Sequence, residues 1–225
     1  MFNSTDTKYT TLQRSTLINF LKDGLHENII HYNKNKTLAE EIKLEVEKYK
    51  QKAIIVSADI LKDADIKEMI SKGIRVFDKI DVLANCAAAV IPNIKFQDLV
   101  WTDFLQQMEL NIKSTFSIIQ AVVPEMIKNG YAKIINIGSF SAEKPNAEWS
   151  HYITAKSALI GLTKSLAFEL APKGIRINMV TPSLVNTELT SEIPEKIKLL
   201  TAAQTPLRRL ALAEDVAGII GFLAS

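Results

Sequence analysis

The sequence is poor in the residues that would assign it to several common classes of protein. Among its 225 residues there is one cysteine, Cys86, which forms no internal disulfide, so we expect a reducing, cytoplasmic location. Three scattered histidines with one cysteine provide no metal-ligand cluster, so no metal is expected. No apolar run approaches the roughly 20 residues that cross a bilayer. The start, MFNSTDTKYT, lacks the apolar core of a secretion signal.

The chain also lacks a strong charge of either sign. Its net charge is +2, which gives no reason to expect nucleic-acid binding. Hydrophobic residues make up 47% and charged residues 23%, proportions typical of a globular protein. A chain of this length can bury one large core, and the absence of repeats or linkers indicates one domain over 1–225.

Short apolar runs alternate with longer helical patterns along the chain. These runs are rich in branched apolar residues at both odd and even positions, so both faces of each strand would be apolar. This is typical of parallel strands covered on two faces. The runs span 28–32, 53–56, 81–85, 133–137 and 175–180. Apolar stripes predict helices between them, with Leu38, Ile42, Val46 and Tyr49 on one, Phe104, Met108, Ile112, Phe116 and Ile119 on another, and a third over 152–170. The alternation predicts an α/β fold with a doubly wound, Rossmann-like parallel sheet.

The two ends fit this fold less well. Such a sheet usually opens with a strand and a glycine-rich turn that lets backbone amides approach a pyrophosphate. Here the first glycine is Gly24, after a helix expected at 12–22, and YTTLQ at 9–13 is a poor central strand. At the other end the chain stops at Ser225, after a helix expected at 215–223, with no further strand.

Polar residues gather where the predicted strands end. Ser139 follows the run 133–137, and Asn85 ends the run before it. Tyr152 and Lys156 begin the next helix four residues apart, so their side chains share one face. Ligands bind at the carboxyl ends of strands in open α/β sheets, so this edge is the expected site.

The chemistry of these residue types suits a carbonyl or alcohol substrate. A phenol has a reference pKa of about 10, and a neighbouring ammonium favours the phenolate. We therefore expect Lys156 to lower the pKa of Tyr152, so that the phenol exchanges a proton with an alcohol oxygen. Ser139 is positioned to hydrogen-bond the same oxygen. The amino-acid side chains supply no hydride, so the hydride has to come from a bound cofactor.

From about residue 28 to residue 225 the sequence resembles the short-chain dehydrogenase/reductase family. The motifs that carry the resemblance are Tyr152-x-x-x-Lys156, Ser139 in NIGSFS, Asn111 in LNIKSTF, Asn85 in NCAA, Asp59 in SADI, and PSLVNTELT at 182–190. The stretches SALIGLTKSLAFELAPKGIRINMV and AQTPLRRLALAEDVAGIIGFLAS resemble the bacterial 3-oxoacyl-acyl-carrier-protein reductase branch, which implies fatty acid biosynthesis.

The resemblance implies a role for each matching residue. Tyr152 is the acid/base, Lys156 lowers its pKa and holds the nicotinamide ribose, Ser139 positions the substrate oxygen, and Asn111 holds a proton-relaying water. The remaining residues contact the cofactor: Asp59 and Ile60 at the adenine, Asn85 and Ala87 at the adenosine ribose, and Pro182, Val185 and Thr187 at the nicotinamide.

The same resemblance implies a preferred cofactor. Family members that use NAD usually carry an acidic residue after the second strand, to bind the ribose 2′-OH. Here Asn33 and Lys34 follow NIIHY, and a lysine suits a 2′-phosphate, so NADP(H) is expected, with NAD(H) possible.

Each site residue also has a simpler interpretation. Lys156 is otherwise a solvated helix lysine, and Ser139 a turn residue. Asn111 is otherwise bonded within its helix pair, and Asp59 caps the next helix. Lys34 lies in the lysine-rich NKNKTLAEEIK, which also reads as a solvated face.

For two residues outside the predicted site we expect no functional role. Cys86 is expected to fill space beside the strand end, and His151 to be exposed. The helices at 104–119 and 152–170 carry more apolar surface than one sheet face needs, and in the family they pair across a dimer axis. We therefore expect a homodimer or homotetramer.

The sequence departs from the family pattern at its glycines. The T-G-x-x-x-G-x-G turn is absent from residues 5–15, NNAG has become NCAA, and PG has become PS at Ser183. Three explanations stay open: a truncated or partial chain, another route to the cofactor, or a member with weakened cofactor binding. The leading hypothesis is reduction of a ketone, such as a 3-oxoacyl thioester carried by an acyl carrier. The alternative is a non-catalytic binding or assembly subunit.

Overall fold

The structure is a computed structural model that describes residues 9–10, 29–32, 36–89, 91–187, 190 and 193–225. The strands are β1 Tyr9–Thr10, β2 Ile29–Tyr32, β3 Ala53–Val56, β4 Val82–Asn85, β5 Ala88–Ala89, β6 Ala132–Ile137 and β7 Ile175–Val180. The α-helices are α2 Lys36–Lys48, α3 Asp63–Phe77, α4 Trp101–Met108, α5 Ser114–Asn129, α6 Ser150–Leu170, α7 Glu195–Gln204 and α8 Ala213–Ala224. The predicted alternation of strands and helices is confirmed.

Parallel pairing brings the strand ends level. β4, β6 and β7 form one sheet in that order, and β2 pairs with β3, also in parallel. Asn85 lies opposite Asn136, and Ile137 lies opposite Val180. Two predicted strand runs coincide with β3 and β7, and the other three differ from β2, β4 and β6 by one residue at the amino end.

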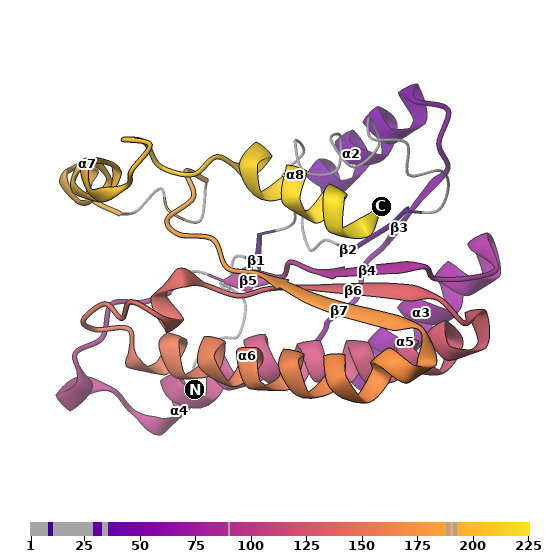
Figure 1. Cartoon of the computed structure of the whole chain (residues 1–225), viewed down its shortest axis with the longest axis horizontal. Helices are drawn as coiled ribbons and strands as arrows, with labels where there is room; N and C mark the ends of the chain where they lie inside the picture. Colours follow the sequence, from indigo (N-terminus) through magenta and orange to yellow (C-terminus); the bar gives the residue numbers. More distant parts are fainter. Residues whose placement is uncertain (1–8, 11–28, 33–35, 90, 188–189, 191–192) are drawn as a thin grey trace.

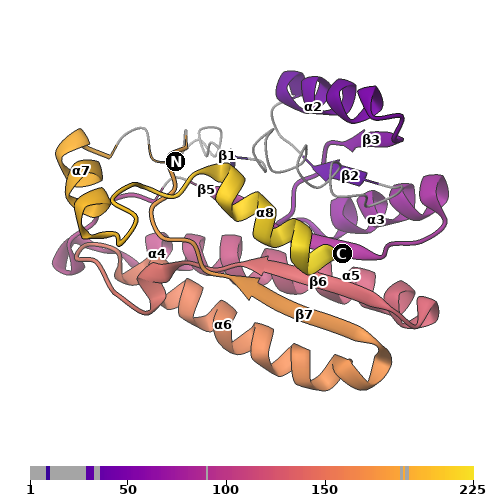
Figure 2. The same ribbon diagram turned by 45° about the horizontal axis from the view of Figure 1, so that its top comes forward.

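Helices cover both faces of the sheet, as the doubly wound expectation required. Figures 1 and 2 show α4, α5 and α6 on one side of β4, β6 and β7, and α8 on the other. The neighbours Ile134 and Ile135 of β6 point to opposite faces, and both are fully buried. Because both faces of the sheet are buried, successive residues of its strands are apolar, whichever face they point to.

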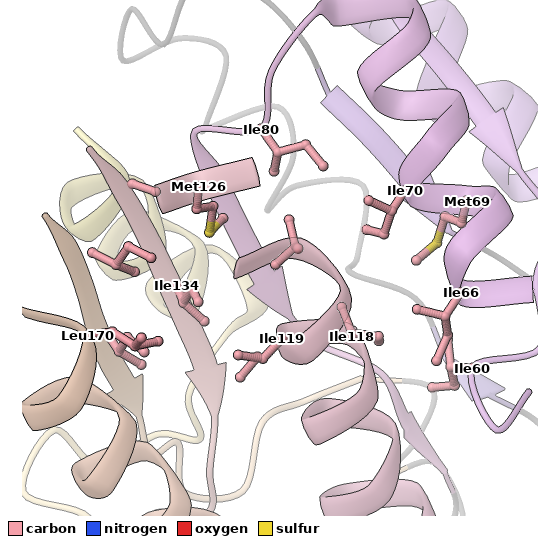
Figure 3. Close-up of a cluster of buried hydrophobic side chains, with 14 of the residues drawn as sticks. Ile60, Ile66, Met69, Ile70, Ile80, Ile118, Ile119, Met126, Ile134 and Leu170 are labelled. Atoms are coloured by element: carbon pink, nitrogen blue, oxygen red, sulfur yellow. The ribbon is translucent and has the colours of Figure 1, made fainter. Parts of the chain in front are cut away.

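The main core lies between the sheet and the helices α3, α5 and α6. Figure 3 shows side chains of these helices meeting beside β6: Ile66, Met69 and Ile70 of α3, Ile118, Ile119 and Met126 of α5, Ile134 of β6 and Leu170 of α6. Four other residues, Ile135, Val180, Ile220 and Ala224, form a smaller cluster beneath α8. Removing this apolar surface from water is the chief stabilising contribution, and it holds the strand ends in place.

The apolar stripe predicted over 104–119 is correct only in part. A π-helical turn at Glu109–Lys113 separates α4 from α5. Such a turn inserts an extra residue and rotates the buried face of the helix. Phe116 is consequently 45% exposed, whereas the polar Thr115 is buried.

Strand β6 holds one charged residue that its apolar pattern does not explain. Lys133 is only 3% exposed. Its Nζ donates to the carbonyl oxygen of Ala224 at 2.7 Å and also to that of Ser225. The carbonyl end of a helix carries partial negative charge, so the last turn of α8 satisfies this buried ammonium.

The N-terminal strand is short and antiparallel. β1 pairs with β5, with Tyr9 opposite Ala89, so it is not a central parallel strand, in agreement with the sequence analysis. The helix predicted at 12–22 lies outside the described residues.

We expect Gly174→Ala to lower the free energy of unfolding by about 2 kcal/mol. Gly174 has φ +79°, and an added Cβ would lie 2.0 Å from the carbonyl oxygen of Gly130. The matched control is Gly218→Ala in α8, where an added Cβ meets nothing within 4 Å. Because alanine favours the helix over glycine, this substitution should raise the free energy of unfolding by about 0.5–1 kcal/mol. Urea unfolding measures both. Equal midpoints for the two variants would contradict the predicted clash.

Candidate active site

The carboxyl ends of β4, β6 and β7 lead into the predicted site. Ser139 follows β6, is 8% exposed, and accepts a hydrogen bond from the backbone N–H of Ser141 at 3.2 Å. This bond caps the short turn that follows the strand, so the expected turn role of Ser139 is also present. Helix α6 then begins at Ser150 and brings Tyr152 and Lys156 to the same region.

Tyr152 and Lys156 face one another across one turn of α6. The Nζ of Lys156 lies 5.8 Å from the centre of the Tyr152 ring. Lys156 is 5% exposed, and its Nζ donates to the carbonyl oxygen of Ile137 at 2.8 Å. The interpretation of Lys156 as a solvated surface lysine is therefore wrong, because α6 packs this side chain against the end of β6.

Burial dominates the electrostatics around Lys156. It lowers the pKa of the Lys156 ammonium to about 8, because desolvation disfavours the charged form, and the Cys86 thiol acts in the opposite sense. Burial also raises the pKa of Cys86 to about 12, against the effect of Lys156. A thiol with such a pKa stays protonated and unreactive, which agrees with the space-filling role expected for Cys86.

Tyr152 differs from expectation in the direction of its pKa. Burial raises the pKa of the Tyr152 phenol, and the neighbouring Ser139 hydroxyl only partly offsets this rise. The sequence predicted a lowered pKa caused by Lys156. Desolvation of the phenol is the larger cause, and the ammonium, 5.8 Å from the centre of the ring, does not reverse it.

Asn111 lies in the π-helical turn and is 7% exposed. Its Nδ2 donates to the backbone oxygen of Gln107 at 2.9 Å and to the Oε1 of Gln107 at 3.2 Å. The side chain is thus bonded within its own helix pair, as the simpler interpretation held. Gln107 is 3% exposed, and the sequence analysis missed it, although its spacing of four residues from Asn111 was a usable signal.

A buried amide network joins Asn85 to helix α6. Its members are Asn85, Asn136 and Thr163, and the sequence analysis singled out only Asn85. A small pocket at the same edge is lined in part by Asn85, Asn111 and Lys156. The structure therefore brings these three predicted residues together.

The residues predicted to contact the adenosine lie in different surroundings in the structure. Asp59 accepts a hydrogen bond from the backbone N–H of Leu61 at 3.1 Å and lies 3.7 Å from the Lys62 ammonium, so it shapes the turn before α3. Ile60 is 4% exposed within the main core, which leaves only its backbone to face a ligand. Ala87 lines the pocket beside Asn85. Lys34 lies outside the described residues.

Backbone groups of the segment after β7 are hydrogen-bonded to the turn after β6, to Ala211 and to the Thr190 side chain. The carbonyl oxygen of Pro182 accepts from the backbone N–H of Phe140 at 2.9 Å, which links this segment to the turn after β6. Val185 forms a parallel bridge with Ala211. Thr187 donates from its backbone N–H to Thr190 Oγ1 at 3.1 Å.

His151 is the clearest error of the sequence analysis. It was expected to be exposed, yet it is fully buried, and neither ring nitrogen has a hydrogen-bond partner among the described residues. Its position at the start of α6, where that helix packs against α4, explains the burial. Burial lowers the pKa of His151, and the Asp103 carboxylate acts in the opposite sense.

In the part of the chain that the structure describes, no three His, Cys, Asp or Glu residues are grouped to hold a metal ion. No helix in the same part is long and apolar enough to pass through a bilayer.

A Rossmann-like α/β fold with serine, tyrosine and lysine at the carboxyl edge of its sheet defines a class, the dinucleotide-dependent oxidoreductases. A family model described as enoyl-(acyl carrier protein) reductase matches residues 20–225. The chain therefore belongs to the short-chain dehydrogenase/reductase family, as the sequence motifs predicted.

Individual relatives agree with this assignment. The chain is 30% identical to 3-oxoacyl-acyl-carrier-protein reductase FabG of Staphylococcus epidermidis over 214 residues, 94% of this chain and 86% of the relative. It is 34% identical to the FabG of Aquifex aeolicus over 190 residues, 84% of this chain and 75% of the relative.

Solved structures share the fold. A 7α-hydroxysteroid dehydrogenase complexed with NADH and 7-oxo glycochenodeoxycholic acid has a TM-score of 0.89 at 30% identity, covering 96% of this chain and 84% of its own. Levodione reductase, at 22% identity and a TM-score of 0.89 over 96% of this chain and 86% of its own, shows the fold alone.

The described residues fit the sugar end of a nicotinamide dinucleotide. The buried Lys156 ammonium has three N–H groups and, within the described part of the chain, donates one hydrogen bond, to the carbonyl oxygen of Ile137. A buried cation with unused donors is costly unless a ligand or water satisfies them. The expected pyrophosphate turn, by contrast, falls largely outside the described residues.

The lowered pKa of Lys156 predicts a specific dependence of stability on pH. Between about pH 8 and 10.5 the unfolded chain holds a proton on this amine that the folded chain has released. The free energy of unfolding of the wild type, minus that of Lys156→Met, should therefore rise with pH across this window, by up to about 3 kcal/mol.

Urea unfolding of the cofactor-free proteins at several pH values measures this difference. Lys164→Met, which removes an exposed lysine from the same helix, is the matched control. A difference between wild type and Lys156→Met that stays flat from pH 8 to 10.5 would mean that the amine is not desolvated.

Proposed function

We propose that this protein is an NADP(H)-dependent reductase of a ketone, with a 3-oxoacyl thioester as the substrate class. The observation that carries the proposal is the arrangement at the end of β6. There the Ser139 hydroxyl adjoins the Tyr152 phenol, and the desolvated Lys156 ammonium lies over the Tyr152 ring. A hydroxyl, a phenol and an ammonium grouped in this way suit proton delivery to a carbonyl oxygen.

The protein residues supply the proton and orient the substrate. Ser139 donates a hydrogen bond to the ketone oxygen, and Tyr152 gives that oxygen its proton as it becomes an alcohol. The raised pKa of Tyr152 keeps the phenol protonated until then, and Lys156 stabilises the phenolate that remains. Asn111 borders the pocket that would hold a proton-relaying water behind Lys156. When bound, the reduced nicotinamide supplies the hydride.

Several residues would hold this cofactor. Lys156 would bind the nicotinamide ribose through its unused N–H groups. As in the family, Asn85 and Ala87 would flank the second sugar, and Asp59 and Ile60 the adenine. Pro182, Val185 and Thr187 would contact the nicotinamide, and Lys34 would pair with a 2′-phosphate.

The acyl-thioester substrate is supported by the FabG relatives, whose name gives their activity as 3-oxoacyl-acyl-carrier-protein reduction. Trp149 also packs edge-on against Tyr152, with ring centres 5.9 Å apart, and offers an apolar wall to an acyl chain. We further propose a cytoplasmic homodimer or homotetramer. Exposed aromatic side chains on the helices expected to pair, such as Phe168 at 88% and Phe116 at 45%, support this assembly.

A second candidate function is a non-catalytic binding or assembly subunit with the same fold. The observation in its favour is the absence of any glycine before Gly24, where the family carries its pyrophosphate turn. Side chains in that turn would hinder backbone approach to the phosphates.

We expect Tyr152→Phe to lower the turnover of 3-oxoacyl thioester reduction about 100- to 10,000-fold, because it removes the proton donor and little else. NADPH oxidation followed by absorbance measures this. The matched control is Tyr131→Phe, which removes an exposed phenol that binds Arg176 at 3.0 Å. Turnover of Tyr152→Phe within a few-fold of the wild type would eliminate the mechanism.

Cofactor preference is tested by titrating the protein with NADPH and NADH and following nicotinamide fluorescence. NADPH should bind about tenfold more tightly, because a lysine–phosphate contact is a charge-assisted hydrogen bond. Lys34→Glu should reverse the preference. Lys36→Glu, which replaces a nearby exposed lysine that lies 3.8 Å from Glu40, should not.

The two remaining outcomes are informative. Equal affinities for NADPH and NADH would contradict the NADP preference alone. No binding of either cofactor at millimolar concentration would favour the non-catalytic function.

A further inference from the structure

Two segments that are far apart in the sequence are joined beside the candidate active site by a pair of hydrogen bonds. One segment, 91–95, follows β5, and the other, 146–149, leads into α6. The indole Nε1 of Trp149 donates to Asn93 Oδ1 at 2.5 Å, and the backbone N–H of Ile94 donates to the carbonyl oxygen of Glu148 at 3.1 Å. The second bond fixes the path of the backbone, and the first fixes the direction of the indole.

The backbone at this junction has an uncommon conformation. Glu148 has φ +67°, in the left-handed region that residues other than glycine seldom adopt. Such a conformation persists only where the surrounding contacts enforce it, and the bond from Ile94 is one of these contacts. Segment 91–95 therefore helps to hold the turn that precedes α6.

The indole that Asn93 holds contacts the expected proton donor. Trp149 lies at the start of α6, where its carbonyl oxygen accepts from the backbone N–H of Ile153 at 2.8 Å. Its ring packs edge-to-face on the Tyr152 ring, with the ring centres 5.9 Å apart and the planes at 80°. Trp149 precedes Tyr152 by three residues and Lys156 follows it by four, so the phenol ring has a neighbour toward each end of the helix.

The place of the Tyr152 ring matters because proton transfer depends on geometry. The phenol has to come within hydrogen-bond reach of the ketone oxygen, and a small displacement lowers the rate. Tyr152 is only partly buried, so neighbours at the edge of the site, and not the core alone, set the position of its ring. The Trp149 indole is such a neighbour, and Asn93 fixes its direction from another part of the chain.

We propose that Asn93 is a positioning residue for the reduction: it accepts the indole hydrogen of Trp149, holds that ring against Tyr152, and so keeps the phenol directed at the ketone oxygen. This inference rests on the proposed function. Asn93 itself is exposed and acts only through the indole, so its replacement should leave the core intact.

The first test measures the turnover of 3-oxoacyl thioester reduction. Asn93→Ala removes the acceptor and should lower turnover about fivefold, the effect of losing one ordinary hydrogen bond, while the KM for NADPH stays unchanged. Asn93→Asp, whose carboxylate still accepts from the indole N–H, should restore turnover. The matched control is Asn146→Ala, which removes another exposed asparagine, one that donates to Ser141 at 3.3 Å, and should behave like the wild type.

The Trp149→Phe background shows whether Asn93 acts through the indole. Phenylalanine keeps a ring beside Tyr152 but has no N–H, so Asn93→Ala should cause no further loss of turnover in this background. A fivefold loss in both backgrounds, or wild-type turnover in Asn93→Ala alone, would overturn the proposal.

A second measurement needs neither cofactor nor turnover. In the cofactor-free protein the Trp149 ring shifts the NMR signals of the Tyr152 ring protons, which are assigned by their loss in Tyr152→Phe. Asn93→Ala should move these signals toward those of a tyrosine without a neighbouring ring, and Asn93→Asp should leave them near the wild-type positions. If the wild type reduces no 3-oxoacyl thioester, the proposed function fails, and these signals alone judge the positioning: identical Tyr152 signals in Asn93→Ala and the wild type would refute it.

Discussion

The candidate active site depends on the buried ammonium of Lys156. Lys156 lies between α6 and the end of β6, where a single carbonyl oxygen, that of Ile137, accepts its hydrogen bond at 2.8 Å. A charge held out of water needs partners, and this one has donors to spare. The parallel register of β4 and β6 brings the pocket wall to the same point. Among the described residues the Lys156 ammonium makes one hydrogen bond, so it keeps N–H groups that a polar ligand can accept from.

Two polar systems meet at this cation. On one side the Ser139 hydroxyl and the Tyr152 phenol form a proton-delivering pair, and burial keeps the phenol protonated. On the other side, hydrogen bonds link Asn85 of β4 to Asn136 of β6 and Asn136 to Thr163 of α6. The apolar core behind them keeps both systems rigid.

Local patterns in the sequence predicted most of the fold. Every main strand was found to within one residue, because branched apolar runs report burial directly. The errors concern contacts between distant segments. His151 is buried because α6 packs against α4, and Lys133 is buried because carbonyl oxygens at the end of α8 accept its hydrogen bonds. The π-helical turn changed which side of α5 is buried, which a regular helical period cannot anticipate.

The sequence by itself determined the family and the shared face of Tyr152 and Lys156, because a spacing of four residues is a property of any α-helix. Only the tertiary structure decided the state of those groups. Whether the ammonium lowers the pKa of the phenol, or desolvation raises it, depends on how much water the packed helices exclude. The link between Asn85, Asn136 and Thr163 likewise exists only once two strands and a helix are packed together.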